Sequence, residues 1–333
     1  MSKADIIFRD MCKDIIENGT TTEGQKVRPV WEDGTPAYTI KKFGVVNRYD
    51  LREEFPAITF RRTALKSAMD EILWIYQKKS NNINNLNSHI WDEWADKTGS
   101  IGKAYGYQIA QEFLHHKDKF GPYNSKEEMI KDERLLTLAK EKGYSDIESF
   151  MKANYPVEPN INGIQIVNSY YMDQMNAVLY DLKNTPFSRR IITNMYNISE
   201  LHAMNLHPCA YSCTFNVTDE GGDKLVLNMV LNQRSQDVLA ANNWNVVQYA
   251  ILLMMIAQVS GMEAGVLLHV IADAHIYDRH VDIIKELITR ESYPAPIVAL
   301  DPDITDFYDF TTNSLRVENY KFGPQVENIP IAI

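Results

Sequence analysis

The chain is poor in cysteine, with Cys12, Cys209 and Cys213 as its three cysteines among 333 residues. An odd and sparse set in a chain of this length argues against a disulfide framework and favours a reducing compartment, so we expect a cytoplasmic protein. The first residues carry charges before any apolar run begins, which differs from a secretory signal peptide. The longest apolar run, residues 250–257, is too short to cross a bilayer, so we expect no membrane partner.

Positive charge is also in deficit, because 34 lysine and arginine residues stand against 44 aspartate and glutamate residues, for a formal net charge of −10. A surface with this balance repels polyanions, so we expect no stable nucleic-acid partner. Any phosphate site must therefore be a local cluster of cations. The sequence also lacks a glycine-rich dinucleotide-binding motif and a P-loop motif.

Apolar material is ample, since 45% of the residues are hydrophobic and 23% are charged, which suits a large buried core. Apolar periodicity predicts helices at residues 2–18, 63–77, 170–183, 245–260 and 274–289. It predicts strands at residues 38–46, 211–217 and 225–231, the last two joined as a hairpin. This irregular alternation predicts an α/β (α+β) fold, with a mixed β-sheet covered by helices. Within one domain over residues 1–333, the lysine- and glutamate-rich segment 112–165 is expected to be a small inserted subdomain.

The first chemical candidate is Cys209, which follows a proline and opens a predicted strand. A lone cysteine is more often a small buried hydrophobe than a nucleophile, and Cys12 and Cys213 keep that interpretation. The segment QRSQD at 233–237 places a cation, a hydroxyl and a carboxylate at the end of the hairpin that begins at Cys209. An arginine there would favour the thiolate and could also hold a phosphate with its planar fork. The alternative is an exposed ion pair at a strand end.

A basic pair, Arg189 and Arg190, lies between a predicted helix and an apolar strand start, where such pairs are usually solvated. The motifs SRRI at 188–191, PC at 208–209, QRSQD at 233–237 and DAHIY at 273–277 occur in one order along the chain. In these motifs and in segments 70–74, 90–96, 104–106 and 330–333, the sequence resembles the thymidylate synthase family. The resemblance covers nearly the whole chain outside 112–165, where several family members carry an insertion.

The resemblance implies reductive methylation of dUMP to dTMP with 5,10-methylenetetrahydrofolate as co-substrate, which becomes dihydrofolate, and no metal. Cys209 would attack C6 of uracil and so make C5 nucleophilic. The folate would supply the carbon and the hydride. It also implies a homodimer in which Arg189 and Arg190 enter the partner's site.

The resemblance assigns roles to residues by their match to the family motifs. The side-chain amide of Asn245 would donate to O4 of uracil and accept from N3, and Glu71 would take part in proton transfer. The catalytic set is Cys209, Glu71, Tyr105, Arg234, Asp237 and Asn245. The dUMP-binding set is Arg28, Arg189, Arg190, Cys209, Gln233, Arg234, Ser235, Asp237, Asn245, His275 and Tyr277. The folate-binding set is Glu71, Trp91, Trp94, Asp237, Ala241 and Ala332, and Ile333 resembles the end of a closing C-terminal segment.

Bland interpretations of these residues stand beside the functional ones. Trp91 and Trp94 are also typical of aromatic core packing, and His275 and Tyr277 could satisfy each other's polar groups. The segment AANNW at 240–244 departs from the family's leucine-glycine-x-proline-phenylalanine run, with Ala241 in place of glycine, and Ala210 replaces a histidine common in relatives.

Three other functions remain open. A pyrimidine nucleotide hydroxymethylase on the same fold would usually have an acid at Asn245. A non-enzymatic nucleotide or RNA binder would need neither Cys209 nor Glu71. A cysteine hydrolase would pair Cys209 with His275 or His207.

Overall fold

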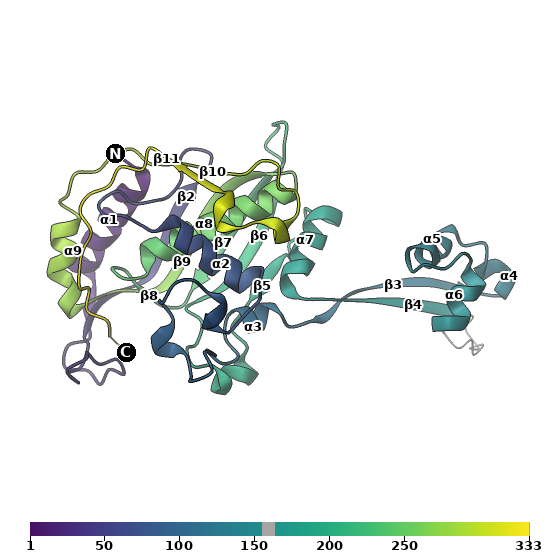
Figure 1. The fold of residues 1–333 in the computed structure, drawn as a ribbon, viewed down its shortest axis with the longest axis horizontal. Coiled ribbons are helices and arrows are strands. Elements are labelled where there is room, and N and C mark those ends of the chain that lie inside the picture. Colours follow the sequence, from purple (N-terminus) through teal and green to yellow (C-terminus); the bar gives the residue numbers. More distant parts are fainter. Residues whose placement is uncertain (155–163, 333) are drawn as a thin grey trace. The chain divides into compact units, whose positions relative to one another are not determined.

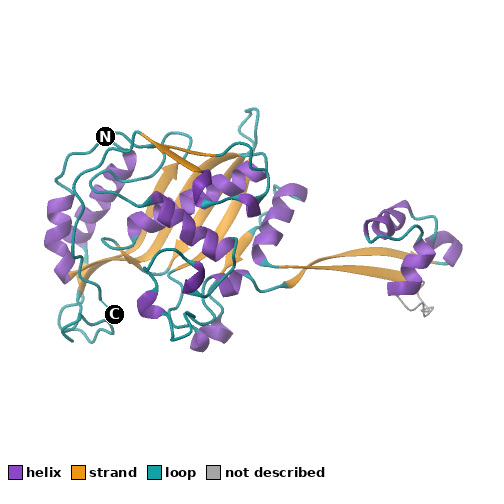
Figure 2. Ribbon diagram, viewed as in Figure 1, coloured by secondary structure: helices purple, strands orange, loops and turns teal. Residues whose placement is uncertain are grey.

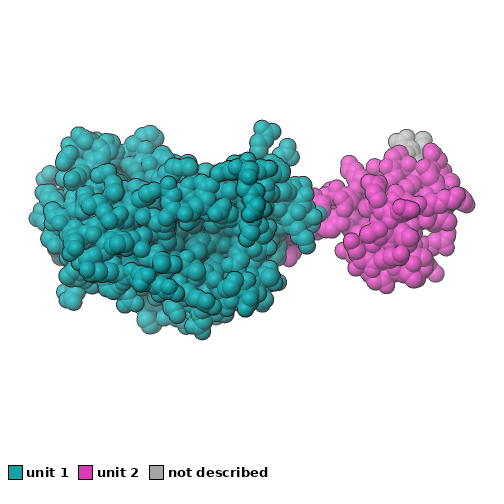
Figure 3. Space-filling view, turned by 90° about the horizontal axis from the view of Figure 1, so that it is seen from above, with its two compact units in different colours: residues 1–111, 174–333 teal, residues 112–173 magenta. Residues whose placement is uncertain are grey.

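The structure, a computed structural model, describes residues 1–154 and 164–332 and divides into two compact units (Figures 1 and 2). The first unit contains Met1–Gln111 and Gln174–Ile333, and the second contains Glu112–Asp173 (Figure 3).

The first unit is built on a mixed sheet with the strand order β1-β2-β9-β7-β6-β5. Strands β7 and β8 pair with β9 in parallel, whereas the other neighbours are antiparallel. The α/β class with a mixed sheet covered by helices is therefore confirmed, and so is the hairpin of β6 and β7. The strands are β1 (Thr20–Thr21), β2 (Thr39–Asp50), β5 (Ile192–Asn194), β6 (Ala210–Thr218), β7 (Val226–Gln233), β8 (Gln236–Asp237) and β9 (Glu263–Tyr277), with a separate pair β10 (Ile297–Leu300) and β11 (Leu315–Glu318).

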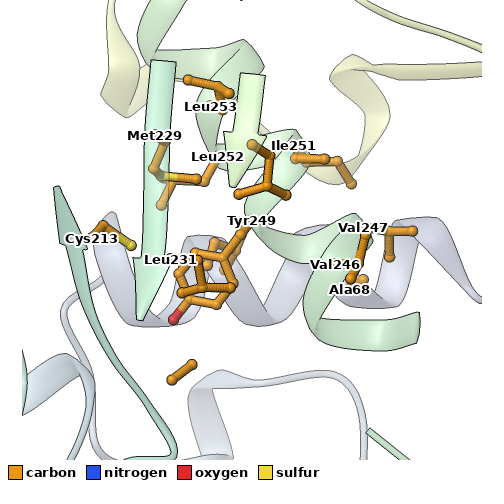
Figure 4. Close-up of a cluster of buried hydrophobic side chains, with 14 of the residues drawn as sticks. Ala68, Cys213, Met229, Leu231, Val246, Val247, Tyr249, Ile251, Leu252 and Leu253 are labelled. Atoms are coloured by element: carbon orange, nitrogen blue, oxygen red, sulfur yellow. The ribbon is translucent and has the colours of Figure 1, made fainter. Parts of the chain in front are cut away.

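Helix α8 (Asn242–Val259) lies at the centre of the core, because its own residues are apolar and buried on nearly every side. Its Tyr249 and Leu252 lie among Leu231 of β7, Cys213 of β6 and other buried side chains (Figure 4). The remaining helices of this unit are α1 (Lys3–Asn18), α2 (Leu65–Tyr76), α3 (Gly106–Ile109), α7 (Gln174–Asn184) and α9 (Val281–Leu287). Short 3₁₀ turns are η1 (Ile83–Asn85), η2 (Asp92–Trp94), η3 (Ile198–Ala203), η4 (Asp278–His280), η5 (Phe307–Asp309) and η6 (Thr312–Ser314).

The second unit has a hydrophobic core of its own, which includes Phe120, Leu135 and Phe150. Its antiparallel strands are β3 (Phe113–Tyr123) and β4 (Ile164–Met172), and its helices are α4 (Lys126–Met129), α5 (Glu133–Glu141) and α6 (Ile147–Asn154). The expected end of the insertion at residue 165 falls inside β4, because the pairing of β3 with β4 continues to Met172.

Two helix starts were predicted wrongly. The helix expected at 274–289 begins only at 281, because β9 continues to Tyr277 and pairs with β2 there. The helix expected at 170–183 begins at 174, because Tyr170–Met172 belong to β4. The first difference matters for the site, because the extended strand places His275 opposite Asp237 of β8.

Gly106→Ala should destabilise the first unit, because a Cβ at Gly106 would lie 2.2 Å from the backbone oxygen of Ser80. Backbone atoms cannot move aside as a flexible side chain can, so we expect the free energy of unfolding to fall by about 1–3 kcal/mol. Gly222→Ala is the matched control, since the nearest atom to a Cβ there is 4.0 Å away. Urea unfolding followed by tryptophan fluorescence measures both variants, and equal midpoints would contradict the steric argument.

Candidate functional site

The candidate site lies where β6 begins and β7 ends. In the antiparallel ladder Ala210 pairs with Gln233, so Cys209 and Arg234 are the next residues on either side. The Arg234 backbone N–H donates to the Cys209 carbonyl oxygen over 3.0 Å. The hairpin register therefore fixes which cation lies beside the cysteine.

The Arg234 guanidinium faces the Cys209 sulfur at 3.6 Å from Nη2. Two carbonyls hold it there, because Nε donates to Pro208 (3.0 Å) and Nη2 to His207 (2.8 Å). Burial raises the pKa of the Cys209 thiol, while the charges of Arg234 and Arg28 act to lower it. The two guanidinium groups are thus the features that favour the reactive thiolate.

Tyr105, the residue immediately before α3, contacts the same cysteine. Its phenolic oxygen accepts a hydrogen bond from the Cys209 backbone N–H over 3.2 Å. Its ring lies 4.8 Å from that of Trp91 in an edge-on arrangement, and burial raises the pKa of its hydroxyl. The backbone of Tyr105 has φ +47° and ψ −107°, a strained conformation for a residue with a side chain. Such strain often occurs at functional sites.

Glu71 of α2 is buried beneath two tryptophans. Its Oε1 accepts from Trp91 Nε1 (2.9 Å) and its Oε2 from Trp244 Nε1 (2.5 Å). Burial raises the pKa of this carboxyl, and the two indole N–H groups partly oppose that shift. Trp244 lies in the first turn of α8 and was not predicted as a site residue. A tryptophan in the segment that differs from the family pattern is a signal that could have found it, because an indole N–H removed from water needs an acceptor.

Asn245 lies in the first turns of α8 and is half-buried. Its Oδ1 accepts a hydrogen bond from Gln233 Nε2 over 3.2 Å. The last residue of β7 is thus linked directly to the amide expected to bind the pyrimidine.

Asp237 of β8 accepts two backbone hydrogen bonds at Oδ1, from Leu239 and Ala240, each of 3.0 Å. Its Oδ1 also lies 3.6 Å from Nδ1 of the fully buried His280. Burial opposes the charged form, but His280 and the Ala240 N–H outweigh it and lower the pKa of Asp237. His280 was not predicted as a site residue.

His275 and Tyr277 lie together at the end of β9, with ring centroids 5.1 Å apart. His275 Nδ1 forms a 2.9 Å hydrogen bond with Asp273 Oδ1, and Asp273 also pairs with Lys41. Burial raises the pKa of Tyr277 to about 12. His275, which was predicted to bind dUMP, is therefore held in place by a carboxylate that sequence analysis did not single out.

The C-terminal segment reaches this region through His280, whose Nε2 bonds the Pro330 carbonyl oxygen over 2.7 Å. Ala332 is half-buried two residues further on, and Ile333 lies outside the described residues.

The predicted arginines fall into two groups. Arg234 and Arg28 lie close enough to Cys209 for their charges to act on its thiol. Arg189 and Arg190 are exposed, and within residues 1–154 and 164–332 no ion pair or hydrogen bond joins either guanidinium to the site. The side chain of Ser235 is half-buried and has no hydrogen bond to another described residue.

A cavity of about 550 Å³ lies beside Trp244. Burial lowers the pKa of Arg61 in its wall, and the Asp237 charge opposes this shift. Arg61 and Arg62 were not predicted as site residues, because two adjacent arginines outside any motif are typical of a solvated surface. Ala241, immediately before α8, has a φ of −113°. The Cβ that it carries in place of the family's glycine is therefore unstrained. The cavity is lined by Arg61, Arg62, Thr63, Ala64, Ala240, Asn243, Trp244, Phe322 and Gln325.

Trp94 is half-buried, and its ring lies 5.8 Å from the ring of Trp91, which is bonded to Glu71.

Among the described residues, no cluster of histidine, cysteine, aspartate and glutamate has the geometry of a metal site. No described helix combines the length and apolarity that a membrane span needs.

Comparison with known proteins identifies one family. The family model for thymidylate synthase matches residues 6–332. The chain is 35% identical over 330 residues to a thymidylate synthase of Bacillus mojavensis, and 34% identical to thymidylate synthase 1 of Bacillus subtilis strain 168, covering 98% of each chain. The solved thermostable thymidylate synthase A from Bacillus subtilis superposes with a TM-score of 0.77 at 33% identity, over 99% of both chains.

Glu71→Gln should change the pH dependence of stability. Burial raises the pKa of Glu71 above its ordinary value of 4.5, so between 4.5 and the raised pKa the folded state binds more protons than the unfolded state. The wild-type stability from this group therefore falls as pH rises through that interval, and glutamine removes the effect. Glutamine also presents an NH₂ to one of the two indoles, a pH-independent cost of about 1–3 kcal/mol.

We therefore expect Glu71→Gln to be less stable than wild type at low pH. The difference between their free energies of unfolding should narrow as pH rises. Urea unfolding at a series of pH values measures it, with the exposed Glu93→Gln as the control for loss of a charge. A gap that stays constant or widens with pH would exclude a raised pKa at Glu71.

Proposed function

Because this chain belongs to the thymidylate synthase family, we infer that it is a methyltransferase that converts dUMP to dTMP, and we propose that the residues described above form its active site. The observation that carries the proposal is the Arg234 guanidinium held 3.6 Å from the Cys209 sulfur. A thiolate stabilised in this way can add to C6 of uracil, forming a carbon–sulfur bond and moving the electron pair of the C5–C6 bond toward O4. C5 then carries the nucleophilic density that the reaction needs.

Arg234 also supports a phosphate site. Its Nε and Nη2 are used by backbone carbonyls, whereas its Nη1 has no hydrogen-bond partner among the described residues. One guanidinium can therefore stabilise the thiolate and donate to the dUMP phosphate. We propose that Arg28 and Ser235 complete the phosphate contacts from this chain.

Asn245 and Glu71 have the chemistry expected at the pyrimidine. An amide can donate to O4 and accept from N3–H, which suits uracil. A buried carboxyl with a raised pKa is suited to deliver and remove protons at the base, and Tyr105 is suited to the proton removal at C5. We propose that Gln233, Asp237, His275 and Tyr277 position the nucleoside.

The co-substrate 5,10-methylenetetrahydrofolate supplies the one-carbon unit and the hydride. The cavity beside Trp244 fits such a molecule, because aromatic surface and two arginines, Arg61 and Arg62, suit a flat ring with an anionic tail. We propose that Trp91, Trp94, Ala241 and Ala332 border the folate, with Glu71 and Asp237 at its polar edge. No metal takes part in this proposal.

The other functions are less well supported. The family model and the relatives named above are thymidylate synthases, so they do not support the hydroxymethylase alternative over dUMP methylation. The cysteine-hydrolase dyad needs a histidine ring beside the thiol, but the described partners of the Cys209 sulfur are Arg234 and the His207 carbonyl. The indole N–H groups of Trp91 and Trp244, both bonded to the buried Glu71 carboxylate, argue for a catalytic rather than a purely phosphate-binding site.

We further propose a cytoplasmic homodimer. Arg189 and Arg190 are exposed and follow α7, and their guanidinium groups have no hydrogen bond or ion pair with the described site residues of their own subunit. Two exposed guanidinium groups suit the phosphate of a second subunit's bound dUMP.

Cys209→Ser should abolish turnover, because a serine hydroxyl ionises far less readily than a thiol and is a weaker nucleophile. We expect a loss on the order of 10³-fold or more in dihydrofolate formation and in release of the C5 hydrogen from labelled dUMP. Cys213→Ser is the matched control, since the buried Cys213 sulfur lies 3.6 Å from the Tyr76 hydroxyl, away from Arg234. Equal turnover by Cys209→Ser and wild type would exclude the proposed nucleophile.

The shared-site proposal predicts complementation between two inactive proteins. A protomer with Arg189→Ala and Arg190→Ala keeps its cysteine, and a Cys209→Ala protomer keeps its arginines. Random pairing should restore about a quarter of wild-type activity, because half of the dimers are mixed and each has one complete site. Absence of any recovery in mixed dimers verified by mass spectrometry would show that the arginines act in their own subunit.

A further inference from the structure

A chain of hydrogen bonds runs through Asn245 from two residues that the active site does not contain. His269 Nε2 of β9 meets Gln233 Oε1 of β7 at 2.7 Å, and Gln233 Nε2 meets Asn245 Oδ1 at 3.2 Å. Asn245 Nδ2 then meets Gln248 Oε1, one turn along α8, at 3.3 Å. His269, Gln233 and Gln248 are buried, so the partners that hold the half-buried Asn245 are themselves shielded from competing water.

The His269 end gives the chain a direction. Burial lowers the pKa of His269 to about 3, so the ring is neutral at physiological pH and carries one N–H. Its Nδ1 is buried without a hydrogen-bond partner among the described residues, whereas Nε2 faces Gln233 Oε1. A proton on Nδ1 would leave a buried donor unsatisfied and two acceptors in contact, so the proton lies on Nε2.

The Gln248 end requires the same direction. Gln248 Nε2 is buried without a hydrogen-bond partner among the described residues, and Gln248 acts on Glu71 to lower the pKa of that carboxyl. Reversing the amide would place its carbonyl oxygen toward the Glu71 carboxylate. A donor facing the carboxylate is the favourable arrangement, and it leaves Gln248 Oε1 to accept from Asn245.

We propose that His269 and Gln248 are specificity-determining positioning residues, which lock the carboxamide of Asn245 in the orientation that selects uracil over cytosine. The inference rests on the proposed contact between Asn245 and the pyrimidine. With the chain in place, Asn245 keeps one lone pair on Oδ1 and one N–H on Nδ2 for the base. Uracil offers the matching N3–H donor and O4 acceptor.

Cytosine offers the opposite pattern, a lone pair at N3 and an amino group at C4. A freely rotating carboxamide would satisfy cytosine by turning over, so the asparagine alone does not discriminate between the two bases. Discrimination requires that rotation be opposed at both ends, by the His269 N–H through Gln233 and by the Gln248 oxygen. Neither residue needs to touch the nucleotide.

The test compares binding of the two nucleotides rather than turnover alone. His269→Phe keeps a large ring but removes the N–H, and Gln248→Leu removes the acceptor. For each we expect the ratio of the dCMP to the dUMP dissociation constant to fall about 10-fold or more relative to wild type. His269→Gln restores a donor toward Gln233 and should recover most of the ratio.

Gln258→Leu is the matched control, because Gln258 is on the same helix but donates to the Asp301 and Ile304 carbonyls. It should leave the ratio unchanged even where it lowers the melting temperature. An unchanged ratio in folded His269→Phe and Gln248→Leu, or an equal loss of both ligands, overturns the positioning role while leaving dUMP methylation intact. If His269→Phe does not fold, the ratio measured for Gln248→Leu decides whether the positioning role holds. A wild-type protein that binds dCMP as well as dUMP would overturn the proposed contact between Asn245 and the pyrimidine.

Discussion

The site depends on the position of one guanidinium, that of Arg234, between two backbone carbonyls and the Cys209 sulfur. Burial alone would keep the thiol protonated, and a protonated thiol is a poor nucleophile. A mobile surface arginine could not offset this, because its charge would be solvated and screened. The carbonyls of His207 and Pro208 hold the cation in place, and the pairing of Ala210 with Gln233 brings those carbonyls to it.

The polar groups at the proposed pyrimidine site are likewise held by hydrogen bonds. Glu71 has two indole donors, Asp237 has two backbone N–H donors and a histidine, and Asn245 is bonded at both ends of its amide. A buried polar group without a partner is costly, so groups satisfied in this way are held in one orientation. A rigid site recognises one pattern of donors and acceptors better than a flexible one, and this links core packing to substrate choice.

The sequence allowed prediction of those parts of the molecule that depend on local patterns. The α8 helix and the β6–β7 hairpin follow from periodicity, and the position of Cys209 beside Arg234 follows from the hairpin. Contacts between distant segments were not predictable in this way. Trp244 reaches Glu71 across 173 residues, and nothing in either local sequence specifies that pairing. The pattern of residues 274–277 suits both a helix and a strand, so the prediction of a helix there was wrong, because these residues pair with β2.

The second unit illustrates how a fold accommodates extra chain without rebuilding its site. Phe113 and Met172, at the two ends of the inserted strands, are paired with each other in the β3–β4 ladder. The two ends of this segment therefore lie next to each other, as the ends of a short turn do. Among the described residues, its core of Phe120, Leu135 and other buried side chains is formed from its own segment. A segment whose two ends are paired with each other and whose core is its own adds little entropic cost of loop closure to the chain that carries it.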